Sequence, residues 1–203
     1  MSRVRTFLMV VVFPTASVFL VSCGSGNGPE LNASEIMAGG DTGPCPTNIQ
    51  WARYDALASL NRAVLNFSAN SIGHGFPPGE CTDFVSAALA GAHARGFSDP
   101  RHDGNYVWGN LITTVTSASA SLASVRPGDI IQMRNVSFRW TVPNGWRSST
   151  FGHHTAVVSA IAADGHSLCI YQQNAPIGSK VNQSYYPVYG MQDGTMWIYR
   201  PSR

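Results

Sequence analysis

The sequence contains little charge, and no charge of either sign is concentrated in one place. Lys, Arg, Asp and Glu together make up 12% of the 203 residues, and the formal net charge is +2. There is no run of Lys or Arg of the kind that nucleic-acid binding requires. Internal repeats and coiled-coil heptads are also absent, which argues against a solenoid or a fibrous helix. We therefore expect one ordinary domain with no nucleic-acid partner.

Spacings typical of metal sites are missing as well. The sequence has neither a CxxC pair nor an HxxxH pair, and these are common arrangements of zinc ligands. Cys81 with the adjacent His153 and His154 is the one set that makes zinc conceivable. We expect no metal and no cofactor.

The amino terminus resembles an export signal. Arg3 and Arg5 precede a short apolar stretch, residues 7–20, which a proline interrupts. A basic start and a short apolar run are typical of a secretory signal, and the run is too short for a comfortable membrane span. It ends in Leu20-Val21-Ser22-Cys23, which resembles the bacterial lipobox. In that interpretation Cys23 is lipidated and anchors an exported protein in the cell envelope, at the outer membrane if the cell is Gram-negative. The alternative is an ordinary cleavable signal with an incidental cysteine.

Residues 24–46 are rich in Gly, Asn, Ser and Pro and have little apolar periodicity, which is typical of a flexible tether. The predicted organisation is therefore a signal at 1–23, a tether at 24–46 and one domain at 47–203, long enough to bury a core. We expect the protein to be monomeric.

Four cysteines are present, Cys23, Cys45, Cys81 and Cys169. If Cys23 is lipidated and Cys81 is a free thiol, Cys45 and Cys169 remain as a disulfide pair, which an exported protein permits. The alternative is that Cys169, inside an apolar run, is simply buried.

The periodicity of apolar residues changes from helical to extended along the domain. A helical stripe begins near Trp51, after a candidate cap at Thr47 or Asn48, and ends near Asn70. A second stripe follows Cys81 and stops near Gly96. From Arg126 the pattern predicts strands, with a loop over 143–152; the strands are expected at 130–133, 138–142, 154–162, 167–173 and 196–200. Helices followed by antiparallel strands predict an α+β fold with the helices on one side of a sheet.

Cys81 is expected in the first turn of its helix. Unpaired backbone N–H groups and the positive end of the helix dipole favour a thiolate there. Glu80 and Asp83 oppose that effect, so a nearby imidazolium is needed to activate the thiol. The alternative is a small buried residue that packs the start of the helix.

His154 is the candidate base, and the turn at 163–165 decides which residues it meets. If Gly165 is left-handed in a three-residue loop, Ala162 pairs with His166, and His154, Gln172 and Asn174 share one face. If 164–165 form a two-residue turn, the register moves by one and Gln172 and Asn174 go to the other face. His153 is the rival base, and alternation places it on the face opposite His154.

Four segments together resemble a known family. Cys81-Thr82-Asp83-Phe84-Val85-Ser86, Pro127-Gly128-Asp129-Ile130-Ile131, His154-Thr155-Ala156-Val157-Val158 and Gln172-Gln173-Asn174 are similar, in this order, to segments of NlpC/P60 and CHAP cysteine amidohydrolases, most of all the putative amidase-domain branch. The resemblance implies a papain-like fold with Cys81 as nucleophile, His154 as base and a polar third residue. CHAP members often have Glu at the position that Gln172 occupies here. Gln172 cannot stabilise an imidazolium by charge, so Asn174 is the alternative orienting residue.

The resemblance, with the predicted export, implies a cysteine amidohydrolase that cleaves amide bonds in peptidoglycan. The rival class is a non-catalytic lipoprotein that binds the cell wall or a partner through the same fold. Gln172 in place of an acid favours the rival, and the presence of both Cys81 and His154 favours the enzyme.

Overall fold

The computed structural model describes residues 21–22, 45–54, 56–142, 145–174 and 179–203. The predicted lipidation site Cys23 and most of the predicted tether lie outside the described residues. The elements, in chain order, are β1 (Val21–Ser22), α1 (Ser59–Asn70), α2 (Cys81–Gly91), β2 (Asn110–Val115), β3 (Ile130–Val142), β4 (Gly145–Ile161), β5 (Ser167–Gln172), β6 (Asn182–Pro187), the 3-10 turn η2 (Val188–Gly190) and β7 (Met191–Arg200).

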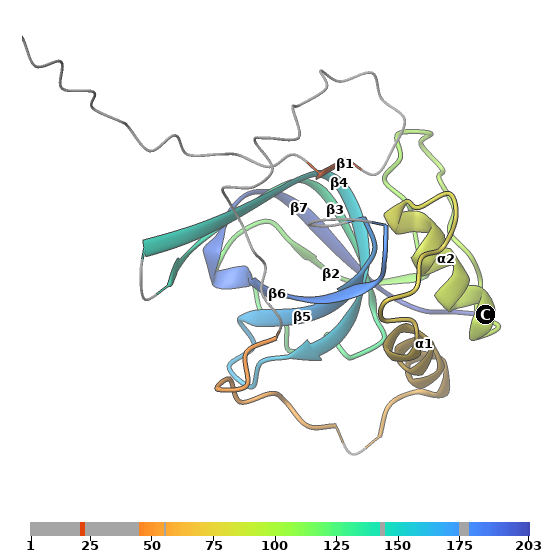
Figure 1. The fold of residues 1–203 in the computed structure, drawn as a ribbon, viewed down its shortest axis with the longest axis horizontal. Coiled ribbons are helices and arrows are strands. Elements are labelled where there is room, and N and C mark those ends of the chain that lie inside the picture. The colour runs from red at the N-terminus through yellow and green to blue at the C-terminus, as the bar shows by residue number, and fades with distance from the viewer. Residues whose placement is uncertain (1–20, 23–44, 55, 143–144, 175–178) are drawn as a thin grey trace, which may run out of the picture.

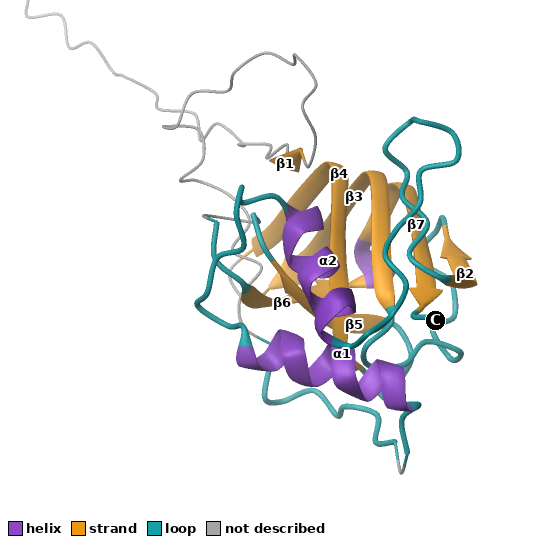
Figure 2. Cartoon of the chain, turned by 90° about the vertical axis from the view of Figure 1, so that its right-hand side faces the viewer, coloured by secondary structure: helices purple, strands orange, loops and turns teal. Residues whose placement is uncertain are grey.

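The strands form one curved sheet in the order β2-β7-β3-β4-β5-β6, in which neighbouring strands are antiparallel. The short β1 pairs with β4 in parallel. Both helices lie on one side of this sheet (Figures 1 and 2). The α+β class and the papain-like arrangement predicted from the sequence are therefore confirmed. No helix within the described part of the chain has the length and apolar character needed to span a membrane.

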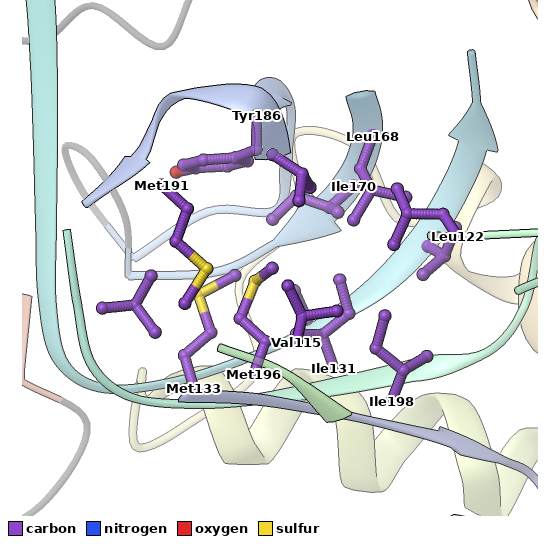
Figure 3. Close-up of a cluster of buried hydrophobic side chains, with 14 of the residues drawn as sticks. Val115, Leu122, Ile131, Met133, Leu168, Ile170, Tyr186, Met191, Met196 and Ile198 are labelled. Carbon is purple, nitrogen blue, oxygen red and sulfur yellow. The ribbon is translucent and has the colours of Figure 1, made fainter. Parts of the chain in front are cut away.

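Two clusters of buried apolar side chains lie on opposite faces of the sheet. The larger one, called here the concave-side cluster, is enclosed by the curved strands (Figure 3), and its members include Ile131, Met133, Phe151, Ala156, Val158, Ile170 and Tyr186. The second, called the helix-side cluster, joins the helices to the other face, and its members include Val64, Phe84, Val85, Leu89, Trp108, Ile130 and Val157. Adjacent residues of β3 and β4 therefore belong to different clusters, as alternation along a strand requires.

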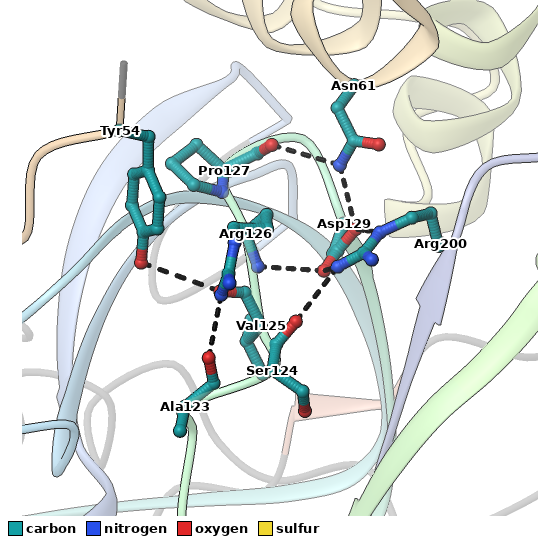
Figure 4. A network of polar contacts seen from close by, with 9 residues as sticks. All are labelled: Tyr54, Asn61, Ala123, Ser124, Val125, Arg126, Pro127, Asp129 and Arg200. Carbon is teal, nitrogen blue, oxygen red and sulfur yellow. Dashed lines mark hydrogen bonds and ion pairs between the residues drawn. The ribbon is translucent and has the colours of Figure 1, made fainter. Parts of the chain in front are cut away.

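A buried carboxylate ties α1 to the sheet. Asp129 accepts hydrogen bonds from the Asn61 amide at 2.7 Å and the Arg126 backbone N–H at 2.8 Å, and Arg200 of β7 contacts both of its oxygens at 3.1 and 3.0 Å (Figure 4). Gly128 before it has φ +85°, and a Cβ there would lie 2.2 Å from the Asn61 carbonyl oxygen. The backbone of the Pro-Gly-Asp segment thus approaches the backbone of α1 so closely at Gly128 that only glycine fits there.

The first helix is shorter than predicted. It begins at Ser59, whereas Trp51 forms an isolated β-bridge with Ala162. The structure joins Cys45 to Cys169 of β5 in a disulfide, as predicted, with 5.9 Å between the Cα atoms. These two long-range attachments hold the segment against the β4–β5 hairpin, and local periodicity contains no information about either.

The prediction of a loop over 143–152 is wrong for residues 145–152, the part that the structure describes. β3 and β4 continue as one long hairpin, and β4 already begins at Gly145. In this part Trp140 packs in the concave-side cluster, and the Arg139 guanidinium lies 4.2 Å from the centroid of the Trp146 ring across the pair. Polar residues alternate with few apolar ones here, so the strand signal is weak. The same reason explains why β6 was not predicted, since Tyr186 is its main contribution to the core.

Candidate active site

Cys81 is the first residue of α2, as the sequence predicts. The helix start is closed by a capping box, in which the Glu80 side chain accepts from the Asp83 backbone N–H and the Asp83 side chain accepts from the backbone N–H of Glu80 at 2.7 Å. Asp83 also accepts from the Gly79 N–H at 3.1 Å. These contacts fix the position at which the helix begins, and so the position of Cys81.

The sulfur of Cys81 is part of a disulfide in this structure. Cys45 and Cys169 are bonded to each other, so the partner of Cys81 lies outside the described residues. This contradicts the prediction that Cys81 is the thiol left out of any disulfide. The prediction rested on counting cysteines, which says nothing about which of them lie close together in the fold.

Gln173 holds the start of α2 against the end of β5. Its amide nitrogen donates to the carbonyls of Phe76 at 2.8 Å and Glu80 at 3.0 Å, and its oxygen accepts from the Phe76 N–H at 2.7 Å. The register Val157↔Tyr171, continued by two residues, places Gln173 opposite Thr155. Cys81 therefore starts its helix over the end of β5 and the middle of β4, on the face that carries Thr155 and its same-face neighbour His153.

The β4–β5 register near the site agrees with the prediction, although the turn does not. Val157 pairs with Tyr171, which is the predicted alignment, and Gly165 has a positive φ of 73°. At the turn, however, Ala162 donates its N–H to Ser167, and the predicted pair with His166 is not formed. An irregularity between Val158 and Ala160 restores the alignment. The loop is one residue longer than predicted, and the bulge compensates for it.

His154 and Gln172 meet as predicted, but on the concave side of the sheet. The His154 Nε2 donates to the Gln172 oxygen at 2.8 Å, the Gln172 amide donates to the Tyr186 hydroxyl at 3.1 Å, and the His154 ring stacks on Phe151 with centroids 4.9 Å apart. Phe151 and Tyr186 belong to the concave-side cluster, whereas α2 packs on the opposite face. The structure therefore does not bring His154 to Cys81, and the predicted role of His154 as its base is corrected.

Burial makes His154 a poor proton acceptor. The side chain is fully buried, and this desolvation lowers the pKa of His154 to about 4, because the charged imidazolium loses its hydration. The hydrogen bond to Gln172 raises the pKa in part, and the neighbouring His153 lowers it further. His154 is thus a neutral member of the core near neutral pH.

Asn174 does not orient a histidine. It lies just beyond the end of β5 with φ 60°, and its amide donates to the Glu80 carboxylate at 3.1 Å. The left-handed backbone turns the chain away from the strand direction at this residue. Asn174 therefore supports the capping residue that precedes Cys81, and its predicted alternative role is corrected as well.

His153, the rival base, is the histidine on the helix side. Its Nε2 lies 2.9 Å from the Gln132 amide nitrogen, and the Gln132 oxygen accepts the indole N–H of Trp108 at 2.9 Å. Trp108 is a member of the helix-side cluster. The Tyr106 ring meets the imidazole edge to face at 5.5 Å between centroids. Alternation correctly predicted that His153 and His154 lie on opposite faces. It did not predict which of the two faces α2 covers.

Gln132 is the site residue that the sequence analysis missed. It is fully buried in β3, where it stands alone among apolar neighbours in Ile130-Ile131-Gln132-Met133. A single polar side chain inside a buried apolar strand requires hydrogen-bond partners. This isolated glutamine was the feature of the sequence that could have indicated a site residue on β3. The chemistry thus gathered on the helix side consists of a cysteine, a histidine and an amide that contacts the histidine, the arrangement of a cysteine hydrolase. Within the described ranges, no group of three His, Cys, Asp or Glu side chains is placed to hold a metal.

Two solved structures of a protein called Ly7917 are similar to the chain. One, with the hydrolysing product of MDP, is 20% identical with a TM-score of 0.42 over 70% of this chain and 62% of that chain. The other is 19% identical with a TM-score of 0.41 over 70% and 63%. The chain thus spans less than two thirds of the length of either.

No curated protein matches the chain. Residues 52–203 match the family model of the AIM3/BBC1 cysteine proteinase-fold domain. This region contains both helices, the six antiparallel strands and every residue of the candidate site described above. The chain, with its papain-like fold, therefore belongs to the AIM3/BBC1 cysteine proteinase-fold domain family.

Proposed function

We propose that this protein is a cysteine hydrolase of amide bonds in which Cys81, once reduced, is the nucleophile and His153 is the base. The observation that carries the proposal is that α2 begins with Cys81 on the same face of the sheet as His153. Backbone N–H groups in the first turn of a helix have no intrahelical acceptor, so they suit the oxyanion that forms when a thiolate attacks a carbonyl. His153 then protonates the leaving amine.

The proposed substrate is an amide bond of peptidoglycan. The support for this substrate comes from the resemblance to NlpC/P60 and CHAP enzymes and from the lipobox-like Leu20-Val21-Ser22-Cys23. An envelope-anchored hydrolase would meet peptidoglycan directly, and a stem-peptide bond or the muramoyl–alanine amide fits the chemistry equally.

The proposal is tested by mass spectrometry of muropeptides after incubation of purified peptidoglycan with the reduced protein. We expect new amine and carboxylate ends with the wild type, no cleavage with Cys81→Ala, and a loss of about 10²-fold or more with His153→Ala. His154→Gln is the matched control, because it changes the adjacent histidine on the other face and should retain most of the activity. Full activity in His153→Ala, or its loss only in His154→Gln, would contradict the assignment.

The assay also tests the state of Cys81. A sulfur held in a disulfide cannot attack a carbonyl, so hydrolysis should require prior reduction with a dithiol such as dithiothreitol. The increase should be absent in Cys81→Ala. Equal activity with and without the dithiol would show that the disulfide does not block the site.

The proposed envelope anchor has a separate test. Cys23→Ala should move the protein from the membrane fraction to the soluble exported fraction, since it removes the acyl chains. A sulfur that carries a lipid cannot also form a disulfide, so this test concerns the lipidated form and the reduction test concerns the disulfide-bonded form. Unchanged fractionation of this variant contradicts lipidation and leaves the hydrolase proposal unaffected.

The second candidate function is a non-catalytic lipoprotein that binds the cell wall. The observation that favours it is that an amide rather than a carboxylate lies beside His153. Sedimentation with insoluble peptidoglycan in the absence of any cleavage by the reduced protein would select this candidate.

A further inference from the structure

Gln132 has its amide orientation determined by three separate contacts. Its oxygen accepts the indole N–H of Trp108 at 2.9 Å, and an indole nitrogen can only donate. Its nitrogen lies 3.3 Å from each of the backbone carbonyl oxygens of Met133 and His154, which share one of its two hydrogens, so the other remains for a third acceptor. Reversing the amide would set a donor against a donor at Trp108 and acceptors against acceptors at the two carbonyls. The nitrogen of Gln132 is therefore the atom that faces His153.

This orientation determines the tautomer of His153. The Gln132 nitrogen lies 2.9 Å from His153 Nε2, and an amide NH₂ group has no lone pair to offer a ring N–H. Nε2 must therefore be the acceptor, and in the neutral ring the proton is on Nδ1. An imidazolium carries a proton on both nitrogens, so its Nε2–H would oppose the amide N–H of Gln132. The contact favours the neutral ring.

We propose that Gln132, clamped by Trp108, positions His153 and holds it as the neutral Nδ1–H tautomer, so that the site rests with Cys81 uncharged when reduced. In the thiolate–imidazolium pair the Cys81 thiol proton has moved to His153, so that Nδ1 and Nε2 both carry a proton. This pair forms only when the Gln132 amide turns its oxygen to accept from Nε2–H, which breaks the contact with Trp108. This inference rests on the proposed function and adds to it a positioning residue on β3. The resemblance to known families pointed instead to the strand after the histidine.

The surroundings of His153 are otherwise of mixed charge. The start of α2 carries two carboxylates. The loop over 99–106 carries two carboxylates, an arginine, a histidine and a tyrosine. The strands add the arginine paired with His153 and the neighbouring histidine. These groups are Glu80, Asp83, Asp99, Arg101, His102, Asp103, Tyr106, Arg134 and His154. All of them are unchanged in the variants below, so a difference between variants reports on the Gln132 contact.

The test is the pH dependence of alkylation of reduced Cys81 by iodoacetamide, resolved by mass spectrometry of the peptide that contains it. In Gln132→Glu, a carboxylate accepts from both Trp108 and His153 Nε2–H and so favours the imidazolium. The pH of half-maximal alkylation should fall by about one unit or more. In Trp108→Phe, the clamp is removed while an aromatic ring is kept, so the amide turns freely and the pH should fall by a smaller amount.

The matched control is Gln172→Glu, which makes the same substitution beside His154 on the concave side. It should leave the alkylation profile of Cys81 at the wild-type position. The proposal is overturned if Gln132→Glu and Trp108→Phe both alkylate as the wild type does, or if Gln172→Glu shifts the profile as far as Gln132→Glu. Thermal unfolding identifies a variant that fails to fold, and if Gln132→Glu fails, Trp108→Phe decides.

The readout also separates this inference from the proposed function. Alkylation reports on the Cys81–His153–Gln132 relationship whether or not any bond is hydrolysed. Shifted alkylation profiles with no cleavage of peptidoglycan would support the positioning role and remove the proposed substrate. Cleavage of peptidoglycan with unshifted alkylation profiles would support the proposed substrate and overturn the positioning role of Gln132.

Discussion

Two adjacent histidines have opposite environments because the side chains of a strand alternate between its faces. His153 contacts a buried amide under the loop that carries Tyr106, whereas His154 is enclosed by Phe151, Gln172 and Tyr186. Burial of His154 favours its neutral form, because the charged imidazolium would lose its hydration and its pKa is therefore lowered. The first is suited to proton transfer and the second to packing.

His154 should make the fold sensitive to acid. Its pKa is lowered from 6.5 to about 4 in the folded state, so the unfolded chain binds the proton more tightly. The contribution to stability is fully present above pH 6.5 and is lost as the pH falls from there through 4, in total about 3 kcal/mol. Urea unfolding at several pH values should show this loss in the wild type and a much smaller one in His154→Gln.

The control for the acid effect is His166→Gln, at an exposed histidine in the β4–β5 turn. It should follow the wild type at every pH. If His154→Gln loses stability with acid as steeply as the wild type, another group is responsible.

At the scale of elements, the Pro-Gly-Asp turn connects three parts of the chain. Asp129 at its end binds Asn61 of α1 and Arg200 of β7, and its own backbone leads into β3. One carboxylate thus sets where the helix layer meets the sheet, and it is fully buried while the Arg200 side chain is one third exposed, at 33%. A buried carboxylate of this kind stabilises the fold only while its donors are present.

Asp129→Asn should lower the free energy of unfolding by about 3 kcal/mol. The amide has no negative charge for Arg200, and its NH₂ group would oppose N–H donors that now contact the carboxylate. Chemical denaturation of the variant measures the loss. Asp193→Asn is the control, since Asp193 is exposed and its one recorded hydrogen bond, from the Gly194 N–H, survives the change. Similar stability of the two variants would contradict the role of the network.

At the scale of the whole molecule, the Cys45–Cys169 disulfide attaches the segment before α1 to β5 of the sheet. The two residues are separated by 124 positions, so the bond restricts most of the unfolded chain. Together with the Trp51↔Ala162 bridge it lines the beginning of the domain along the β4–β5 hairpin.

Cys45→Ala should lower the free energy of unfolding by about 2–4 kcal/mol, measured in urea without reductant, because the unfolded chain regains its conformational freedom. The double variant Cys45→Ala/Cys169→Ala should lose little more, since either change breaks the same bond. A variant with wild-type stability, or two single losses that add, would contradict this account.

The sequence by itself determined the α+β class, the helix that starts at Cys81 and the opposite faces of His153 and His154. Each of these follows from local chemistry, namely turn residues, periodicity and alternation. Only the tertiary structure decided which histidine lies on the side of the sheet that α2 covers, because alternation does not say which face the helices cover. The contact between Gln132 and His153 also needed the tertiary structure, since it joins residues 21 positions apart through the β3–β4 pairing.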